Sequence, residues 1–202
     1  RNKISRTIIH KEPKIGVING LWANALGMGG VIPIQAFYYP STNLFDLKLT
    51  GMQGDVMKES MNVAKTLAWN LSPEKYRKKL TDKKNNDKGL HIHCPEGAVP
   101  KDGPSAGTAI TAAIYSLINN KKIKNEFAIT GEINLQGNVT EIGGLQLKIL
   151  GGIRAGVKHF IYPKSNVKDY NKFLEKYPTV DISNISFYPV SNIKEDLKLV
   201  FT

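Results

Sequence analysis

A serine lies where a loop rich in Pro and Gly meets a predicted helix. Residues 95–107 read Pro-Glu-Gly-Ala-Val-Pro-Lys-Asp-Gly-Pro-Ser-Ala-Gly, and apolar residues then recur at helical spacing from Ser105 to about Ile118. The first N–H groups of a helix lack intrahelical partners and its N-terminus is electropositive. A serine placed there could attack a carbonyl group while nearby N–H groups stabilise the oxyanion. Ser is also a favoured N-cap residue, so a purely structural role for Ser105 stays open.

Lys148 is the second residue whose surroundings could make it reactive. Gly143 and Gly144 open a predicted helix that runs to about Ala155. On this helix Lys148 shares a face with Leu145, one turn before it, and with two glycines one turn after it. Such a face could desolvate the amine and leave it room to reach a hydroxyl group. Burial lowers the pKa of a lysine and makes the neutral amine available as a base. The alternative is a surface lysine whose alkyl chain lies along apolar neighbours.

The serine also satisfies the pattern G-x-S-x-G of the α/β-hydrolase nucleophile elbow. That elbow needs a strand that runs directly into the serine, and residues 100–104, with two prolines, do not form a buried strand. The only histidine downstream is His159, and no aspartate lies between it and Ser105. An esterase would need a glutamate as its third member and His159 as its base.

Two histidines raise the question of a metal site. His91 and His93 lie on one face of a predicted strand, beside Cys94. A zinc site needs further ligands at suitable spacing, and His10 and His159 offer no paired motif. We therefore predict no metal site and interpret the pair as histidines that pack in the core or support a loop.

Alternating short strands and helices must position these residues. The first third reads as strands, followed by a clear helix and a polar connection in which we expect a second, short helix. The second half alternates more regularly, with a hairpin that turns at 136–138. The predicted strands are 14–19, 31–39, 45–49, 91–94, 127–130, 159–162 and 186–190. The predicted helices are 55–71, 74–80, 105–118, 144–155, 167–176 and 193–200.

Composition indicates an ordinary globular protein. Hydrophobic residues make up 41% of the 202 residues and charged residues 22%, no run of 18 apolar residues exists, and the first residues hold no secretory signal. The only cysteine, Cys94, cannot form an intrachain disulfide, which favours a reducing compartment, cytoplasmic or mitochondrial if the source is eukaryotic. The net charge of +11 predicts either a solvated surface or a surface for nucleic acid, and no nucleic-acid motif accompanies it.

Two sequence blocks carry a family resemblance. Residues 95–107 are similar to the signature around the active serine of Lon proteases. Residues 130–133 and 142–145, with Gly137 and Lys148, resemble the block that holds the catalytic lysine of that family. The similarity runs from about Gly20 to the C-terminus. It implies that Ser105 is the nucleophile and Lys148 its general base. It also implies that Thr130 orients the amine.

The resemblance extends to further candidate residues and has departures. Asp102 is interpreted as a supporting residue that shapes the loop. The candidate residues for binding the oxyanion or the substrate are Gly103, Ala106, Glu96 and Gly97. Thr108 stands where the family usually has an aliphatic residue, and Gln146-Leu147 replaces a charged Lys-Glu pair.

The resemblance also implies a fold and a setting. We expect the α+β Lon proteolytic-domain fold, of the kind called ribosomal protein S5 domain 2-like, as a single domain over residues 1–202, with residues 1–13 as a candidate flexible leader. The implied activity is degradation of unfolded or damaged proteins through an acyl-enzyme, in a hexameric ring. The chain has no Gly-Lys dipeptide and therefore no Walker A loop, so we expect no cofactor here and ATP with Mg²⁺ on a separate AAA+ module. Because the sequence does not begin with Met, we expect a fragment of a longer protein. A non-catalytic Lon-like domain used for assembly or binding remains the alternative.

Overall fold

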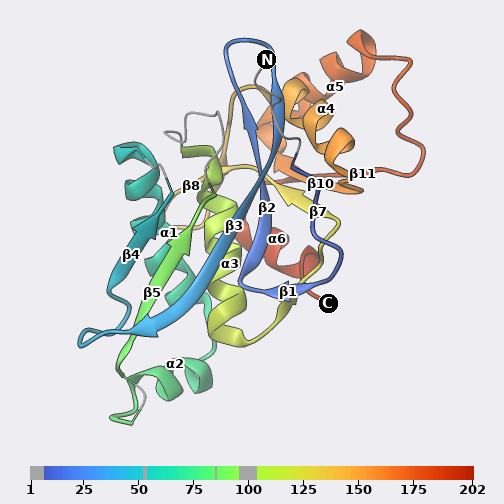
Figure 1. Cartoon of the computed structure of the whole chain (residues 1–202). Coiled ribbons are helices and arrows are strands. Elements are labelled where there is room, and N and C mark those ends of the chain that lie inside the picture. Colours follow the sequence, from blue (N-terminus) through green and yellow to red (C-terminus); the bar gives the residue numbers. More distant parts are fainter. Residues whose placement is uncertain (1–6, 52–53, 85, 96–103) are drawn as a thin grey trace, which may run out of the picture.

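A seven-stranded mixed sheet runs through the middle of the molecule (Figure 1). The computed structural model describes residues 7–51, 54–84, 86–95 and 104–202. The strand order is β11-β10-β7-β2-β3-β5-β4, with the first four strands parallel, β3 antiparallel to both neighbours, and β4 parallel to β5. The strands are β2 (Val17–Ala23), β3 (Gly29–Pro40), β4 (Leu47–Thr50), β5 (Lys88–His93), β7 (Phe127–Ile129), β10 (His159–Pro163) and β11 (Ser186–Val190). Two short pairs lie beside it: β1 (Lys14–Ile15) with β6 (Lys122–Ile123), and β8 (Glu132–Ile133) with β9 (Val139–Thr140).

Helices pack on both faces of the sheet (Figure 1). They are α1 (Asp55–Leu71), α2 (Glu74–Thr81), α3 (Gly107–Asn119), α4 (Leu145–Ala155), α5 (Val167–Lys176) and α6 (Ile193–Leu199), with 3₁₀ turns η1 (Pro104–Ala106) and η2 (Lys164–Asn166). One buried cluster joins α1 and α3 to Ile18 and Ile34 of the sheet, and a second joins α4 and α5 to Leu21 and Val31. Side chains of β2 and β3 that point to opposite faces of the sheet thus contribute to the two clusters, because successive side chains of a strand alternate between the faces. None of the described helices has the length and hydropathy needed to cross a bilayer.

The predicted α+β class is confirmed, and most predicted elements are found. The helix predicted over 55–71 is α1, and the predicted turn at 136–138 joins β8 and β9. The single strand predicted over 14–19 is divided in the structure, because Gly16 interrupts it and separates β1 from β2. This glycine has φ of +73° and its carbonyl accepts the N–H of Ala36 at 2.7 Å. A side chain there would overlap the carbonyl of Ala36, so only glycine allows the kink that sends β1 to pair with β6. Strand β6 was not predicted.

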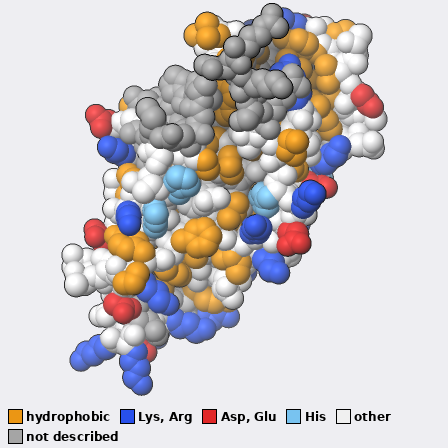
Figure 2. All heavy atoms as spheres, in the orientation of Figure 1, with side chains coloured by type: hydrophobic (Ala, Val, Ile, Leu, Met, Phe, Trp, Pro, Cys, Tyr) orange, Lys and Arg blue, Asp and Glu red, His pale blue; other side chains and the backbone are white. Residues whose placement is uncertain are grey.

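No helix of the described residues lies in front of one part of the sheet. In Figure 1 the ends of β3 and β5 and the edge strand β4 face the viewer, while α1 and α3 lie behind them. Figure 2, in the same orientation, shows hydrophobic and histidine side chains on this area with Lys and Arg side chains round its edge. Phe37 of β3 is 55% exposed.

A close backbone contact fixes α4 against β3. A side chain at Gly151 would overlap the backbone of Gly29, and one at Gly29 would overlap the carbonyl of Leu147. We expect Gly151→Ala to reduce the free energy of unfolding by about 3 kcal/mol, because two backbones must separate to admit the methyl group. Urea unfolding measures this loss. Gly143→Ala is the matched control, since a side chain at Gly143 meets nothing within 4 Å. Equal free energies of unfolding for Gly151→Ala and Gly143→Ala would contradict the close contact between α4 and β3.

Candidate active site

Ser105 lies in the middle of η1, two residues before α3 begins, and is half-buried. The helix predicted to begin at Ser105 begins instead at Gly107, and its N-cap is Ala106, with no side-chain cap hydrogen bond. Ser105 is therefore not the N-cap that the structural alternative required. Its backbone carbonyl accepts the N–H of Gly131 at 2.9 Å. The N–H of Thr108 in turn donates to the carbonyl of Gly131 at 3.1 Å, so the start of α3 is tied to the end of β7 on both sides of the serine.

Lys148 is the fourth residue of α4 and is only 3% exposed. Its ammonium group donates to the hydroxyl of Thr130 at 3.2 Å. Burial disfavours the charged form and lowers the pKa of Lys148 from its ordinary value to about 8. A large fraction of the amine is therefore neutral at mildly alkaline pH, as a general base must be.

Thr130 connects the lysine to the serine. It follows directly after β7, where its N–H donates to Ile161 of the neighbouring strand β10 at 3.1 Å, and it is 1% exposed. The hydroxyl accepts from Lys148 and lies 3.5 Å from the carbonyl oxygen of Ser105, to which it donates. One buried hydroxyl thus contacts both candidate catalytic residues. The sequence pointed to its contact with Lys148, but nothing local indicated the contact with the backbone of Ser105.

The glycines after Lys148 have a different use from the one predicted. The sequence suggested that Gly151 and Gly152 leave open space beside the amine. In the structure Gly151 lies against the backbone of Gly29, and a side chain at Gly152 would overlap the ring of Phe160. The space is filled because both glycines let α4 approach the sheet closely, and this approach buries Lys148.

Comparison with known proteins decides the family. The model of the Lon protease (S16) C-terminal proteolytic domain matches residues 1–202, the whole chain. The chain belongs to the Lon protease family.

Relatives in distant organisms agree with this assignment. The chain is 42% identical over 193 residues to a Lon protease homolog of Acanthamoeba polyphaga mimivirus, covering 93% of this chain and 18% of that protein. It is 43% identical over 187 residues to Lon protease 1 of Borreliella burgdorferi, covering 92% and 22%. It is 41% identical over 189 residues to the Lon protease of Fervidobacterium nodosum, covering 94% and 22%. The chain thus spans about a fifth of the length of these Lon proteins. Membership of the Lon family also argues against the α/β-hydrolase alternative.

Several candidate residues fall outside the described part of the Lon domain. These are Glu96, Gly97, Asp102 and Gly103, so their roles stay predictions. Ala106, the remaining candidate for the oxyanion site, is the half-buried N-cap of α3 and directly follows Ser105.

The two histidines of β5 converge on a hydroxyl group. The Oγ1 of Thr50 lies 2.7 Å from Nε2 of His91 and 2.7 Å from Nδ1 of His93. Cys94 is fully buried and belongs to the core under α1 and α3. Within residues 7–51, 54–84, 86–95 and 104–202, no three His, Cys, Asp or Glu side chains are grouped as a metal would need. The pair therefore links the ends of β4 and β5.

His159 takes part in an aromatic stack. Its ring is parallel to that of Phe127, with centroids 4.4 Å apart, and its Nδ1 lies 3.0 Å from the hydroxyl of Tyr188. Burial lowers the pKa of His159. These contacts give it a packing role between β7, β10 and β11.

Thr108, where the Lon family usually has an aliphatic residue, buries a hydroxyl group. The residue is fully buried, and its Oγ1 has no hydrogen-bond partner among the described residues. Because a buried unpaired hydroxyl is costly, we expect Thr108→Val to raise the free energy of unfolding by about 1 kcal/mol and to leave kcat unchanged. Thermal unfolding and peptide hydrolysis test this. Thr111→Val is the control and should be destabilising, since the Thr111 hydroxyl donates to the Gly107 carbonyl at 2.7 Å.

Proposed function

We propose that this domain hydrolyses peptide bonds through a Ser–Lys dyad of Ser105 and Lys148. The observation that carries the proposal is the burial of Lys148 with its amine on Thr130, the same hydroxyl that contacts the backbone of Ser105. Membership of the Lon family supports the reaction class.

The chemistry follows from the protonation state of the lysine. Neutral Lys148 takes the proton of the Ser105 hydroxyl as the oxygen bonds to the carbonyl carbon of the substrate. The N–H groups at the start of α3 stabilise the oxyanion of the tetrahedral intermediate. The ammonium of Lys148 then returns the proton to the leaving amine, which leaves an acyl-enzyme. Water attacks the ester with Lys148 again as base, and Ser105 is restored.

Thr130 would position both members of the dyad. When its oxygen accepts an N–H of Lys148, the lone pair of the neutral amine can point elsewhere, toward the serine hydroxyl. Its own proton goes to the carbonyl of Ser105, which holds the residue that bears the nucleophile. Through these two contacts Thr130 would hold the base and the nucleophile in a fixed relative position, without taking part in proton transfer itself.

The wider setting is also a proposal. We propose that the domain acts on unfolded or damaged protein chains within a longer Lon protein that assembles as a hexameric ring. In that protein a separate AAA+ module would bind ATP and Mg²⁺ and deliver the substrate, because this chain has no phosphate-binding loop.

A single experiment tests the proposed reaction. We expect the purified domain to cleave a short flexible fluorogenic peptide without ATP and to react with a peptide β-lactone, which acylates a nucleophilic serine. Mass mapping of the labelled protein should place the adduct on Ser105. An unlabelled but folded domain would favour the non-catalytic alternative, and an adduct on another residue would contradict the assignment. ATP should not change the rate, and folded proteins should be cleaved poorly.

A further inference from the structure

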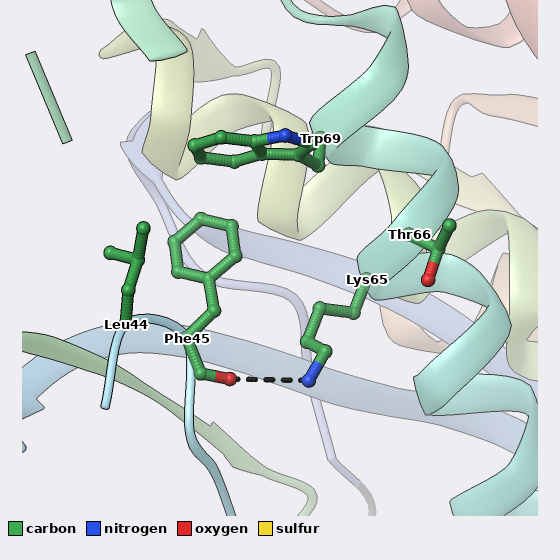
Figure 3. A pocket seen from close by; sticks show the side chains of 5 residues that line it. All are labelled: Leu44, Phe45, Lys65, Thr66 and Trp69. Carbon is green, nitrogen blue, oxygen red and sulfur yellow. Dashed lines mark hydrogen bonds between the residues drawn. The ribbon is translucent and has the colours of Figure 1, made fainter. Parts of the chain in front are cut away.

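A small hollow lies between α1 and the loop that joins β3 to β4. Its volume is about 290 Å³, and it is lined by Leu44, Phe45, Lys65, Thr66 and Trp69 (Figure 3). None of these residues is Ser105, Lys148 or Thr130. The volume is at the lower end of the roughly 300–1,000 Å³ of drug-sized ligand sites, so it fits one large side chain rather than a cofactor.

Phe45 is held in an unusual conformation at this hollow. Its φ is +60°, a left-handed value that a bulky residue rarely adopts. Its N–H donates to the carbonyl of Lys88 at 2.8 Å, and its ring lies edge-on to that of Trp69 with centroids 5.0 Å apart. Figure 3 shows the two rings next to each other, with Leu44 beside them. Such strain persists where surrounding contacts impose it, and it is common where a protein holds a ligand. Here the conformation of Phe45 places its ring beside Trp69, and the two rings form an apolar wall of the hollow.

Lys65 adds a positive charge at the edge of the same wall. Its ammonium donates to the carbonyl of Phe45 at 3.2 Å, which fixes the otherwise flexible side chain beside the aromatic pair (Figure 3). An ammonium has three protons to donate, and the carbonyl takes one. Within the described part of the chain no carboxylate forms an ion pair with Lys65. Asp46, the next residue in the loop, is engaged by the hydroxyl of Tyr39 at 3.3 Å. The hollow therefore combines apolar walls with one cation that has no carboxylate partner among the described residues.

We propose that this hollow binds the C-terminal residue of a peptide. A hydrophobic side chain would lie against Leu44, Phe45 and Trp69, and the α-carboxylate would accept hydrogen bonds from Lys65. One ammonium complements a single carboxylate, whereas a phosphate or a polyanion would call for several donors. Peptide hydrolysis releases a new α-carboxylate at every cut, so the link to product peptides rests on the proposed function, while the site itself does not.

Tryptophan fluorescence reports on this site directly. The chain has two tryptophans, so Trp22→Phe leaves Trp69 as the only one, and Ser105→Ala prevents turnover of the probe. The probe is acetyl-Gly-Gly-Leu with a free carboxylate. We expect saturable changes in Trp69 emission. The Kd should be about fivefold weaker for the same peptide as its C-terminal amide, and for acetyl-Gly-Gly-Ser with a free carboxylate.

Two lysines of α1 provide matched variants. Lys65→Gln should bring the Kd of the free acid to that of the amide, whereas Lys58→Gln, exposed on the same helix, should leave it unchanged. An unchanged Trp69 emission up to millimolar probe, or equal Kd values for acid and amide, would overturn the proposal. The acid–amide comparison needs no change at Lys65, so it decides even if Lys65→Gln fails to fold. Because the readout is the emission of Trp69 on binding and not hydrolysis, the acid–amide comparison tests the hollow separately from the role of Ser105.

Discussion

Ser105→Ala should reduce kcat for peptide hydrolysis by about 10,000-fold or more, because removal of a covalent nucleophile leaves only binding and oxyanion stabilisation. The variant should keep its fold. The hydrogen bonds from Gly131 and Thr130 reach the backbone carbonyl of Ser105, and alanine has the same carbonyl. Circular dichroism and thermal unfolding check the fold, and steady-state hydrolysis of a fluorogenic peptide checks the rate.

The chain offers a closely matched control for this substitution. Ser165 lies in the middle of η2, directly after a Pro-Lys pair, as Ser105 lies in the middle of η1 directly after Pro104. Ser165 is exposed. Ser165→Ala should therefore retain full activity. Appreciable turnover by purified Ser105→Ala protein would eliminate Ser105 as the nucleophile.

Local sequence patterns were sufficient where an element is long or a motif is compact. Helix α1 could be predicted because apolar residues recur at helical spacing over 17 residues and Ser72-Pro73 ends the run. The loop before Ser105 and the glycines before Lys148 drew attention to both residues without any knowledge of the sheet. The motif match then paired them.

Contacts between distant segments could not be predicted in the same way. Strands β1 and β6 have two residues each, too few for a periodic pattern, and their pairing joins segments about a hundred residues apart. The hydrogen bonds that Thr130 and Gly131 direct to the carbonyl of Ser105 involve the backbone, which carries no sequence signature.

The glycines of α4 show why a local interpretation can be right about a residue and wrong about its reason. The sequence places Gly151 on the face of Lys148, and this placement is correct. A helical wheel cannot show what packs on that face, however, and Gly29 of β3 fills it. The amine is buried because two backbones meet there, so the lowered pKa of Lys148 depends on a strand more than a hundred residues away.

The final prediction concerns Lys148 as a base, and its sign follows from the lowered pKa. Only the neutral amine can take the serine proton, and its fraction rises as pH rises through the pKa of about 8. We therefore expect kcat/KM to rise about tenfold per pH unit from pH 6 to 7.5 and to level off above about pH 9. If kcat/KM did not rise with pH toward about pH 8 while the protein stays folded, Lys148 would not be the general base.

Substitutions separate a base from an electrostatic anchor. Lys148→Arg keeps the positive charge but should lose about 10,000-fold in kcat/KM, because a guanidinium stays protonated at every usable pH. Lys148→Met should be equally inactive and no less stable, since methionine is unbranched and only one atom shorter than lysine and removes a buried charge. His159→Ala should keep its activity per folded molecule, because His159 packs against Phe127 and Tyr188. An active Lys148→Arg protein would show that charge alone is needed. A folded but inactive His159→Ala protein would assign the role of base to the histidine. Measuring kcat/KM against pH for the parent and these three variants therefore decides between a lysine base and its alternatives.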